Sequence, residues 1–236
     1  MAKKNSLKSA TAVSKAPQQP AVQFPSVSSK DYLGCRVLLE DQIILIDNFF
    51  TAEECKHFVR FIDGLPLEMT PPKKKGEAER VNQRISFTSP EFAQNLFSVI
   101  SPHLPSFQYP QSVRRPANAP TERAVHSLNT NIRLYKYGPG QYFGPHYDDS
   151  VRDSVTGAKS EWTLLIYLTG VQDGVQGGET IFYKNHRNSP QEAVSSPLTR
   201  GTALLHRHGN ECLLHEGSPV HTGSKYVLRS DLMFVN

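Results

Sequence analysis

The sequence predicts an α+β protein with a mainly β core, a double-stranded β-helix (jelly roll, cupin-like) with N-terminal helices packed on one sheet. From residue 129 onward, short segments rich in β-branched and aromatic residues alternate with turns, and no helical period interrupts them. Upstream, residues 51–65 and 89–102 place apolar side chains at helical spacing. A chain of 236 residues with 38% hydrophobic residues is long enough to bury a substantial core.

The composition divides the chain into three parts. We expect a disordered basic tail over residues 1–34, a strand-helix support region over 35–128 and the barrel core over 129–236. The first 30 residues hold five lysines and no acid, so the formal charge of +4 leaves −1 for the rest of the chain. A nearly neutral barrel argues against nucleic acid as the partner.

The support region contains clear signals for where its strands and helices begin and end. Residues 35–50 are expected to form one or two strands. Thr51 and Glu54 have the spacing of a capping box at the start of the first helix, and a second helix opens on Ser89-Pro90 and stops at Pro102. Residues 106–128 are rich in Pro, Ser, Asn and Arg and are predicted to be a surface loop.

Several classes of protein are excluded by what the sequence lacks. No segment approaches the roughly 18 apolar residues of a membrane helix, and residues 1–20 lack the apolar centre of a secretory signal. The expected location is therefore the cytoplasm or the nucleus, with no membrane partner. Three cysteines, Cys35, Cys55 and Cys212, are an odd number without close pairing, which favours reduced thiols.

The stretch "YGPGQYFGPHYDDS" holds the first candidate for chemistry. In an extended segment, His146 and Asp148 face the same side and could present a nitrogen and a carboxylate to one ion. Two histidines and one carboxylate on one face of an octahedron leave positions open, as non-haem Fe(II) oxygenases require. A hydrogen bond at a strand end is the alternative for this pair.

The third ligand and a cation lie downstream. His215 ends an apolar run, and Lys225 follows ten residues later. A lysine buried in an apolar barrel needs an anion, which a dicarboxylate co-substrate would supply. The rival to His215 is the pair His206 and His208, two residues apart, which would give a cupin-like site made of histidines.

Four motifs carry a family resemblance over about 129–235: "YGPGQYFGPHYD", "TLLIYLTGVQDGVQGGETIFY", "GTALLHRHG" and "LHEGSPVHTGSKYVLRSD". They resemble the 2-oxoglutarate/Fe(II)-dependent dioxygenases of the prolyl 4-hydroxylase-like branch, and "IILIDNFFTAEEC" is similar to the segment that precedes the barrel there. The resemblance implies His146, Asp148 and His215 as iron ligands. It implies that Lys225 pairs with the far carboxylate of 2-oxoglutarate, that Tyr137 hydrogen-bonds the same carboxylate, and that L-ascorbate is a further cofactor.

Two of these roles have alternatives. Lys225, Val227, Arg229 and Asp231 share one face of an extended strand, so Arg229 is a second candidate for the co-substrate. It could instead pair with Asp231 or Asp148. Tyr137 could serve core packing alone.

The implied reaction is oxidative decarboxylation of 2-oxoglutarate to succinate and carbon dioxide, coupled to hydroxylation of a C–H bond. A peptidyl proline or another protein side chain is the substrate that the resemblance suggests, and small molecules remain open. Loops 66–87 and 149–161 are expected to rim the pocket, with Arg80, Asn82, Arg84 and Arg133 as polar groups. The alternatives are a nucleic-acid demethylase of the same superfamily and a non-catalytic jelly-roll binding module.

Overall fold

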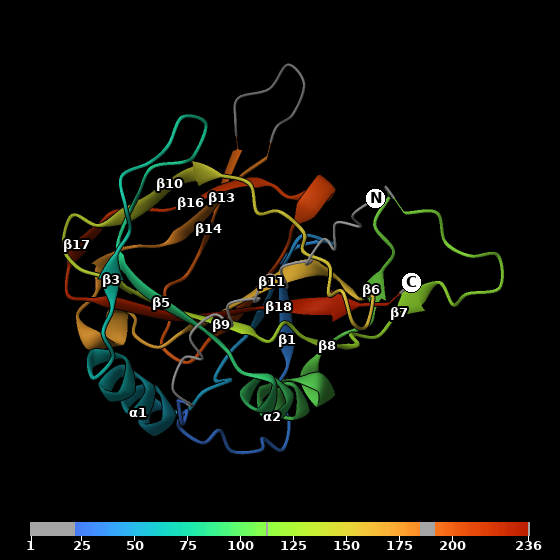
Figure 1. Cartoon of the computed structure of the whole chain (residues 1–236), viewed down its shortest axis with the longest axis horizontal. Helices are drawn as coiled ribbons and strands as arrows, with labels where there is room; N and C mark the ends of the chain where they lie inside the picture. Colours follow the sequence, from blue (N-terminus) through green and yellow to red (C-terminus); the bar gives the residue numbers. More distant parts are fainter. Residues whose placement is uncertain (1–21, 112, 185–191, 236) are drawn as a thin grey trace, which may run out of the picture.

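The computed structural model describes residues 22–111, 113–184 and 192–235 and consists of two stacked β-sheets with two helices outside them. The larger sheet has nine strands in the order β1-β2-β15-β11-β18-β9-β5-β3, with β8 paired to β18. The smaller sheet has the order β14-β13-β16-β10-β4. Figure 1 shows the smaller sheet above the larger one, with α1 and α2 beneath the larger sheet.

The helices are α1 (Ala52–Asp63) and α2 (Pro90–Ile100). The strands of the larger sheet are β1 (Cys35–Leu39), β2 (Ile43–Ile46), β3 (Glu68–Met69), β5 (Gln83–Thr88), β8 (Ser127–Leu128), β9 (Asn131–Tyr137), β11 (Lys159–Tyr167), β15 (Ala203–Arg207) and β18 (Lys225–Phe234). Those of the smaller sheet are β4 (Arg80–Val81), β10 (Tyr142–His146), β13 (Thr180–Lys184), β14 (Glu192–Ser196) and β16 (Leu214–Gly217). Two short pairs complete the set, β6 (Phe107–Gln108) with β7 (Glu122–Arg123), and β12 (Gln176–Gly177) with β17 (Val220–Thr222).

Both helices begin where the sequence predicts. The Thr51 hydroxyl accepts from the backbone N–H of Glu54, and the Glu54 carboxylate accepts from the N–H of Thr51, which is the capping box. Ser89 caps α2, with proline in the first helical position. Across the described residues, neither these helices nor any other is long and apolar enough to cross a membrane.

The larger sheet separates two apolar clusters. On its outer face, Ile132, Leu134 and Leu228 belong to a cluster with the buried side of α1 and α2. On its inner face, Tyr135 and Val227 belong to a second cluster between the two sheets. Successive side chains of β9 and β18 therefore alternate between a helix-covered core and the barrel interior. This is the mainly β jelly-roll class that the sequence predicts.

The support region is built into the barrel. The larger sheet takes β1, β2, β3 and β5 from residues before 129, and the smaller sheet takes β4. Strand β5 pairs with β9 over six residues, and β2 pairs with β15 over four. Each sheet thus combines strands from both sides of the expected boundary between residues 128 and 129. The edge strands of a barrel need hydrogen-bonding partners, and these can come from any part of the sequence.

Two segments differ from the expected tail and loop. The expected tail ends at residue 34; its residues 1–21 lie outside the described part, and Phe24 stacks on Phe92 with ring centroids 4.2 Å apart. Lys30 forms an ion pair with Glu54 at 2.8 Å. In the expected loop, Phe107 is buried against Trp162. One or two large apolar side chains are enough to hold such segments on the core.

Candidate active site

The predicted histidine and aspartate ligands come together between the sheets. His146 of β10 and His215 of β16 are direct cross-strand partners in the smaller sheet, so their side chains share its inner face. Asp148 follows two residues after the end of β10. Its Oδ1 lies 3.7 Å from His146 Nε2, and its Oδ2 lies 3.7 Å from His215 Nε2. One ligand atom from each of the three residues falls within 4.8 Å of the others.

Backbone hydrogen bonds orient both imidazoles. His146 Nδ1 lies 2.9 Å from the carbonyl oxygen of Gly144, and His215 Nδ1 lies 2.9 Å from that of Leu213. A carbonyl oxygen only accepts, so each Nδ1 carries the proton. The lone pair of each Nε2 is therefore directed at the space beside Asp148, as metal-binding histidines require.

Asp148 is held by two donors from the larger sheet. The Arg229 guanidinium donates to both carboxylate oxygens, with Nη1 3.0 Å from Oδ1 and Nη2 3.0 Å from Oδ2. The Thr163 hydroxyl donates to Oδ2 at 3.0 Å, and the same hydroxyl lies 2.9 Å from His208 Nδ1. A carboxylate has about four lone-pair sites, so it keeps capacity for a metal.

The electrostatics of the three residues reflect their burial and proximity. Burial, together with the neighbouring His215, lowers the pKa of His146 to about 3. Burial opposes charge on His215 as well, but contact with Asp148 raises the pKa of His215 to about 9. Burial would raise the pKa of Asp148, yet Arg229 and the histidines hold it well below its usual value. The Asp148 carboxylate is therefore ionised, as a metal ligand has to be.

A cation lies in the same cavity as the three residues. Lys225 is 5% exposed, and its Nζ donates to the carbonyl oxygen of Gly178 at 2.5 Å. It forms no ion pair within the described part of the chain, and burial lowers its pKa to about 8. Tyr137 is the cross-strand partner of Lys225, with its ring centroid 5.5 Å from Nζ. Burial raises the pKa of Tyr137, so its hydroxyl keeps its proton.

All six residues that the sequence analysis assigns to the metal or the co-substrate line this one cavity: His146, Asp148, His215, Lys225, Tyr137 and Arg229. Their relations differ, however. Lys225 has no carboxylate partner there, whereas Arg229 pairs with Asp148 and also lies 3.4 Å from Asp231. The pairing of Arg229 with Asp231 or Asp148 was the alternative to a role at the co-substrate.

The histidine pair that rivalled His215 divides in two. His208 is fully hydrogen-bonded, to Thr163 at one nitrogen and to Ser160 at the other, both at 2.9 Å. His206 instead lines the cavity. Sequence reasoning passed over Thr163 and Tyr135, which also face the interior; the period of two along β9 points to Tyr135, whereas nothing local distinguishes Thr163.

The cavity is reached from outside through a hollow of about 760 Å³. The hollow shares Arg80, Phe143, His146 and Asp148 with the cavity, and residues of the segment 70–78 also line it. Arg84 also lines it, as does Asp149. Loop 66–87 therefore forms part of the rim of the entrance, whereas Asp149 is the one residue of loop 149–161 that lines it.

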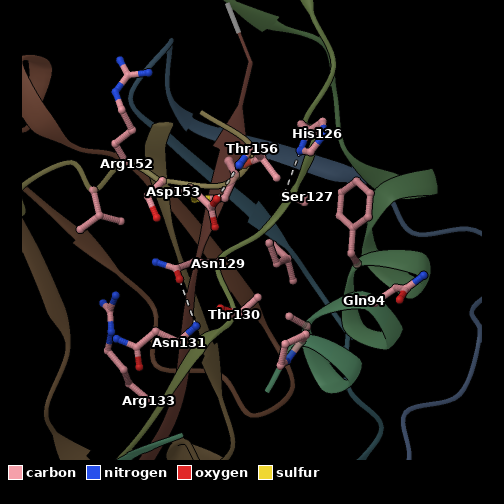
Figure 2. A pocket seen from close by; sticks show the side chains of 17 residues that line it. Gln94, His126, Ser127, Asn129, Thr130, Asn131, Arg133, Arg152, Asp153 and Thr156 are labelled. Atoms are coloured by element: carbon pink, nitrogen blue, oxygen red, sulfur yellow. Dashed lines mark hydrogen bonds between the residues drawn. The ribbon is translucent and has the colours of Figure 1, made fainter. Parts of the chain in front are cut away.

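The rest of that second loop borders a different hollow, of about 750 Å³ (Figure 2). Figure 2 shows Arg152, Asp153 and Thr156 on one side, Gln94 of α2 on another and Arg133 of β9 below. None of the three metal-facing residues lines it. We therefore place the chemistry in the barrel cavity.

The residues of the cavity fit an iron ion and a dicarboxylate. Two imidazole nitrogens and one carboxylate oxygen are the donors of the facial triad that binds non-haem Fe(II). The Lys225 ammonium is buried and forms no ion pair among the described residues, although the more distant charge of Glu179 acts on it, so it supplies a charge that a carboxylate would neutralise. Each of these groups meets a requirement that the sequence alone could only suggest.

The comparisons with known proteins agree with this geometry. The family model of the 2OG-Fe(II) oxygenase superfamily matches residues 132–230. Prolyl 4-hydroxylase 5 of Arabidopsis thaliana is 26% identical over 211 residues, which are 79% of this chain and 66% of that protein's length. The chain thus spans just under two thirds of this relative.

Solved structures support the fold. A prolyl-4-hydroxylase of Pseudomonas putida superposes with a TM-score of 0.52 at 14% identity, covering 83% of this chain and 94% of that one. A prolyl hydroxylase of Trichoplax adhaerens, solved with a peptide fragment of hypoxia inducible factor, gives a TM-score of 0.50 at 14% identity, covering 82% and 84%. At such identities the likeness concerns the jelly-roll fold, and it confirms the predicted fold class.

The matched residues 132–230 are thus similar to the 2-oxoglutarate- and Fe(II)-dependent dioxygenases. These enzymes carry Fe(II) and take 2-oxoglutarate as co-substrate, so both are the cofactors expected at this cavity. Within that class, the likeness to the Arabidopsis protein is a likeness to a prolyl 4-hydroxylase.

Proposed function

We propose that this protein hydroxylates a side chain of a protein substrate, with peptidyl proline as the first candidate, and releases succinate and carbon dioxide. The observation that carries the proposal is the meeting of His146, Asp148 and His215 in one cavity with the unpaired cation of Lys225. When bound, the iron and 2-oxoglutarate would supply the electrons that activate dioxygen for hydroxylation, which no side chain of the protein provides.

In this proposal His146, Asp148 and His215 hold the metal. Arg229 and Thr163 fix the Asp148 carboxylate, and Phe143 stacks on the His146 ring with centroids 3.6 Å apart. Such support keeps the ligands in place before the metal arrives, which lowers the cost of assembling the site.

Lys225 and Tyr137 bind the far carboxylate of 2-oxoglutarate. The Lys225 ammonium provides the charge, and the protonated Tyr137 hydroxyl provides a hydrogen bond. Both lie on the inner face of the larger sheet, opposite the strands that carry His146 and His215. The co-substrate would thus bridge the two sheets, and the buried walls would keep water from it.

The substrate reaches the metal through the hollow lined by residues of segment 70–78 and by residues 147–149. A volume of about 760 Å³ accommodates several residues of an extended peptide. Tyr147 is 56% exposed at its edge and offers an apolar, rigid surface to a prolyl ring. The Arabidopsis relative is named a prolyl 4-hydroxylase, and the Trichoplax neighbour was solved with a peptide, which supports the same class of substrate here.

The test is an aerobic assay of the purified chain with Fe(II), 2-oxoglutarate, L-ascorbate and a library of proline-containing peptides. We expect succinate release that depends on a peptide, and a gain of one oxygen atom in that peptide by mass spectrometry. Leaving out L-ascorbate tests its predicted role, for which a faster loss of activity is expected. Succinate formed at the same rate by His146→Ala as by the unaltered protein would overturn the proposal.

A further inference from the structure

Strand β5 has a free edge over its second half. It pairs with β9 over six residues, but on its other side β3 pairs only with Gln83 and Arg84. In Figure 1, β5 continues past the short β3 toward α2. Residues 85–88 are therefore the outermost segment at this end of the nine-stranded sheet, and Ser86 and Thr88 are exposed.

The hydrogen-bond pattern shows which backbone groups of β5 point outward. The N–H of Ser89 donates to the carbonyl oxygen of Thr130 at 2.8 Å, so the odd-numbered residues face β9. The N–H of Thr70 donates to that of Asn82 at 2.8 Å, so the even-numbered residues face the other side. The outward N–H and carbonyl groups of the free edge are thus those of Ser86 and Thr88.

These four groups have no backbone partner in the part of the chain that the structure describes. The register of β3 would place Pro66 opposite Ser86, but proline has no N–H to donate. The chain also turns there, since the N–H of Leu67 donates to the carbonyl oxygen of Leu65. A row of unpaired N–H and carbonyl groups is a template for another extended segment.

The sheet does not protect this edge in the usual ways. Its opposite edge, β1, has a register shift between Val37 and Leu39, and such a bulge disturbs the row of backbone groups. Strand β5 keeps an uninterrupted register with β9. Residues 85–88 include no lysine and no proline, which commonly block an exposed edge. The edge of β5 is therefore open to pairing.

The free edge adjoins the barrel cavity. Arg84 and Tyr135 are cross-strand partners, so their side chains share the inner face of the larger sheet. A hollow of about 590 Å³ lies on this face beside Ser86. It shares Tyr135 with the barrel cavity and Arg84 with the hollow at the entrance. A peptide that occupies the entrance can thus pass Arg84 and reach the edge, which favours the peptide substrate as the occupant.

We propose that an extended segment of the peptide substrate pairs with Ser86 and Thr88 and adds a strand to the larger sheet beyond β5. The inference rests on the proposed function and adds a second point of attachment to it. Main-chain hydrogen bonds of this kind give affinity, while pockets for side chains give specificity. The added strand lies three strand spacings, about 14 Å, from β18, so the paired segment is at least about four residues from the hydroxylated residue.

The first test is hydrogen–deuterium exchange, read at single residues by mass spectrometry on the anaerobic protein with Fe(II) and 2-oxoglutarate. The probe is a peptide of about 15 residues with the hydroxylated residue at its centre, long enough to reach the edge from either side. We expect it to slow exchange at Ser86 and Thr88 by at least about 10-fold. Ile85 and Phe87, whose N–H groups face β9, should exchange slowly with and without the peptide.

The second test removes an outward N–H. Ser86→Pro is suitable because an edge strand tolerates proline where the N–H faces solvent. We expect the KM of the long peptide to rise by about 10- to 100-fold, toward that of a peptide of about five residues, with kcat little changed. Ser86→Ala is the matched control, since it keeps the N–H, and it should leave this KM unchanged. Thr88→Pro repeats the test, and thermal unfolding shows which variants are folded.

Fast exchange at Ser86 and Thr88 under a saturating peptide would overturn the proposal, as would an unchanged KM in the folded proline variants. Slower exchange at these two residues on raising the protein concentration alone would assign the edge to a second copy of the chain and would also overturn it. Failure of the proposed function looks different, because no peptide would then stimulate succinate release or gain an oxygen atom.

Discussion

The two faces of the nine-stranded sheet have the same backbone but opposite chemistry. Along β18, Tyr226 and Leu228 point into the helix-covered core, while Lys225, Val227 and Arg229 point into the barrel. The outer face gains its stability from apolar burial, whereas the inner face holds charges whose burial is unfavourable by itself. Alternation along a single strand therefore separates the residues that stabilise the fold from those that carry the chemistry.

The largest effect should follow from removing a ligand on the inner face. His146→Ala leaves the metal with one fewer nitrogen, and we expect succinate formation to fall by at least about 100-fold. The unfolding temperature should change little, since His146 lies at the entrance of the cavity. His57→Ala, an exposed histidine of α1, serves as the control with full activity. A His146→Ala variant as active as this control would contradict the assignment of the chemistry to the inner face of the barrel.

A truncation on the outer face should give the reverse pattern. Phe58 is fully buried and packs on Phe50 with ring centroids 5.2 Å apart. Phe58→Ala should lower the free energy of unfolding by about 3–5 kcal/mol, measured by urea denaturation. The activity per folded molecule should stay the same, and a selective loss of turnover in the folded fraction would contradict the comparison.

Arg229 tests whether a charge on the inner face can also contribute to stability. Arg229→Met leaves the buried carboxylates of Asp148 and Asp231 without their shared cation, and we expect a loss of about 3 kcal/mol. The pKa of Asp148 should rise, because Arg229 now lowers it. Fe(II) binding should then weaken as the pH is lowered, more steeply than in the unaltered protein. Equal pH profiles of Fe(II) affinity would show that Arg229 does not control this carboxylate.

Removing the charge of Lys225 should raise the free energy of unfolding, whereas removing that of Arg229 should lower it. Its pKa is lowered to about 8 in the folded protein, so the unfolded chain binds more protons between that value and about 10.4, and stability rises with pH in this window. Lys225→Met should therefore be more stable at pH 7, by about 1–3 kcal/mol, while losing affinity for 2-oxoglutarate. Urea denaturation of both proteins at pH 7 and pH 9 measures this difference in the free energy of unfolding. A Lys225→Met variant that is less stable than the unaltered protein at pH 7 would contradict the assignment of a buried, unpaired charge.

The smallest effect is the pH dependence of co-substrate binding. As Lys225 loses its proton, the KM for 2-oxoglutarate should rise by about 10-fold between pH 7 and pH 9. Lys225→Arg keeps the charge over this range and should flatten the profile. A KM that stays constant in the unaltered protein would show that another group binds the far carboxylate.

Much of this architecture could be predicted because its signals are local. The capping box at Thr51 and the Ser89-Pro90 start place the helices, and the period of two along "KYVLRSD" places Lys225 and Arg229 on one face. The metal-facing set needed the family resemblance, since the pairing of β10 with β16 that makes His146 and His215 neighbours is not written in either segment.

The remainder depends on contacts between distant segments. Whether Arg229 meets a co-substrate or Asp148 is decided by the loop after β10, and no local pattern reveals it. The packing of Phe24 on Phe92 is of the same kind, because an isolated aromatic residue in a basic segment gives no periodic signal. Similarly, only the assembled barrel distinguishes His206, with its unpaired nitrogen, from the satisfied His208.

The central claim is that one cavity joins a metal held by His146, Asp148 and His215 to 2-oxoglutarate held by Lys225. Anaerobic titration of the protein with Fe(II) and 2-oxoglutarate tests it most directly, through the visible charge-transfer band of the chelate. We predict a band that saturates at one equivalent of iron, disappears in His146→Ala and needs far more 2-oxoglutarate in Lys225→Met. A band of unchanged strength in His146→Ala would contradict the account.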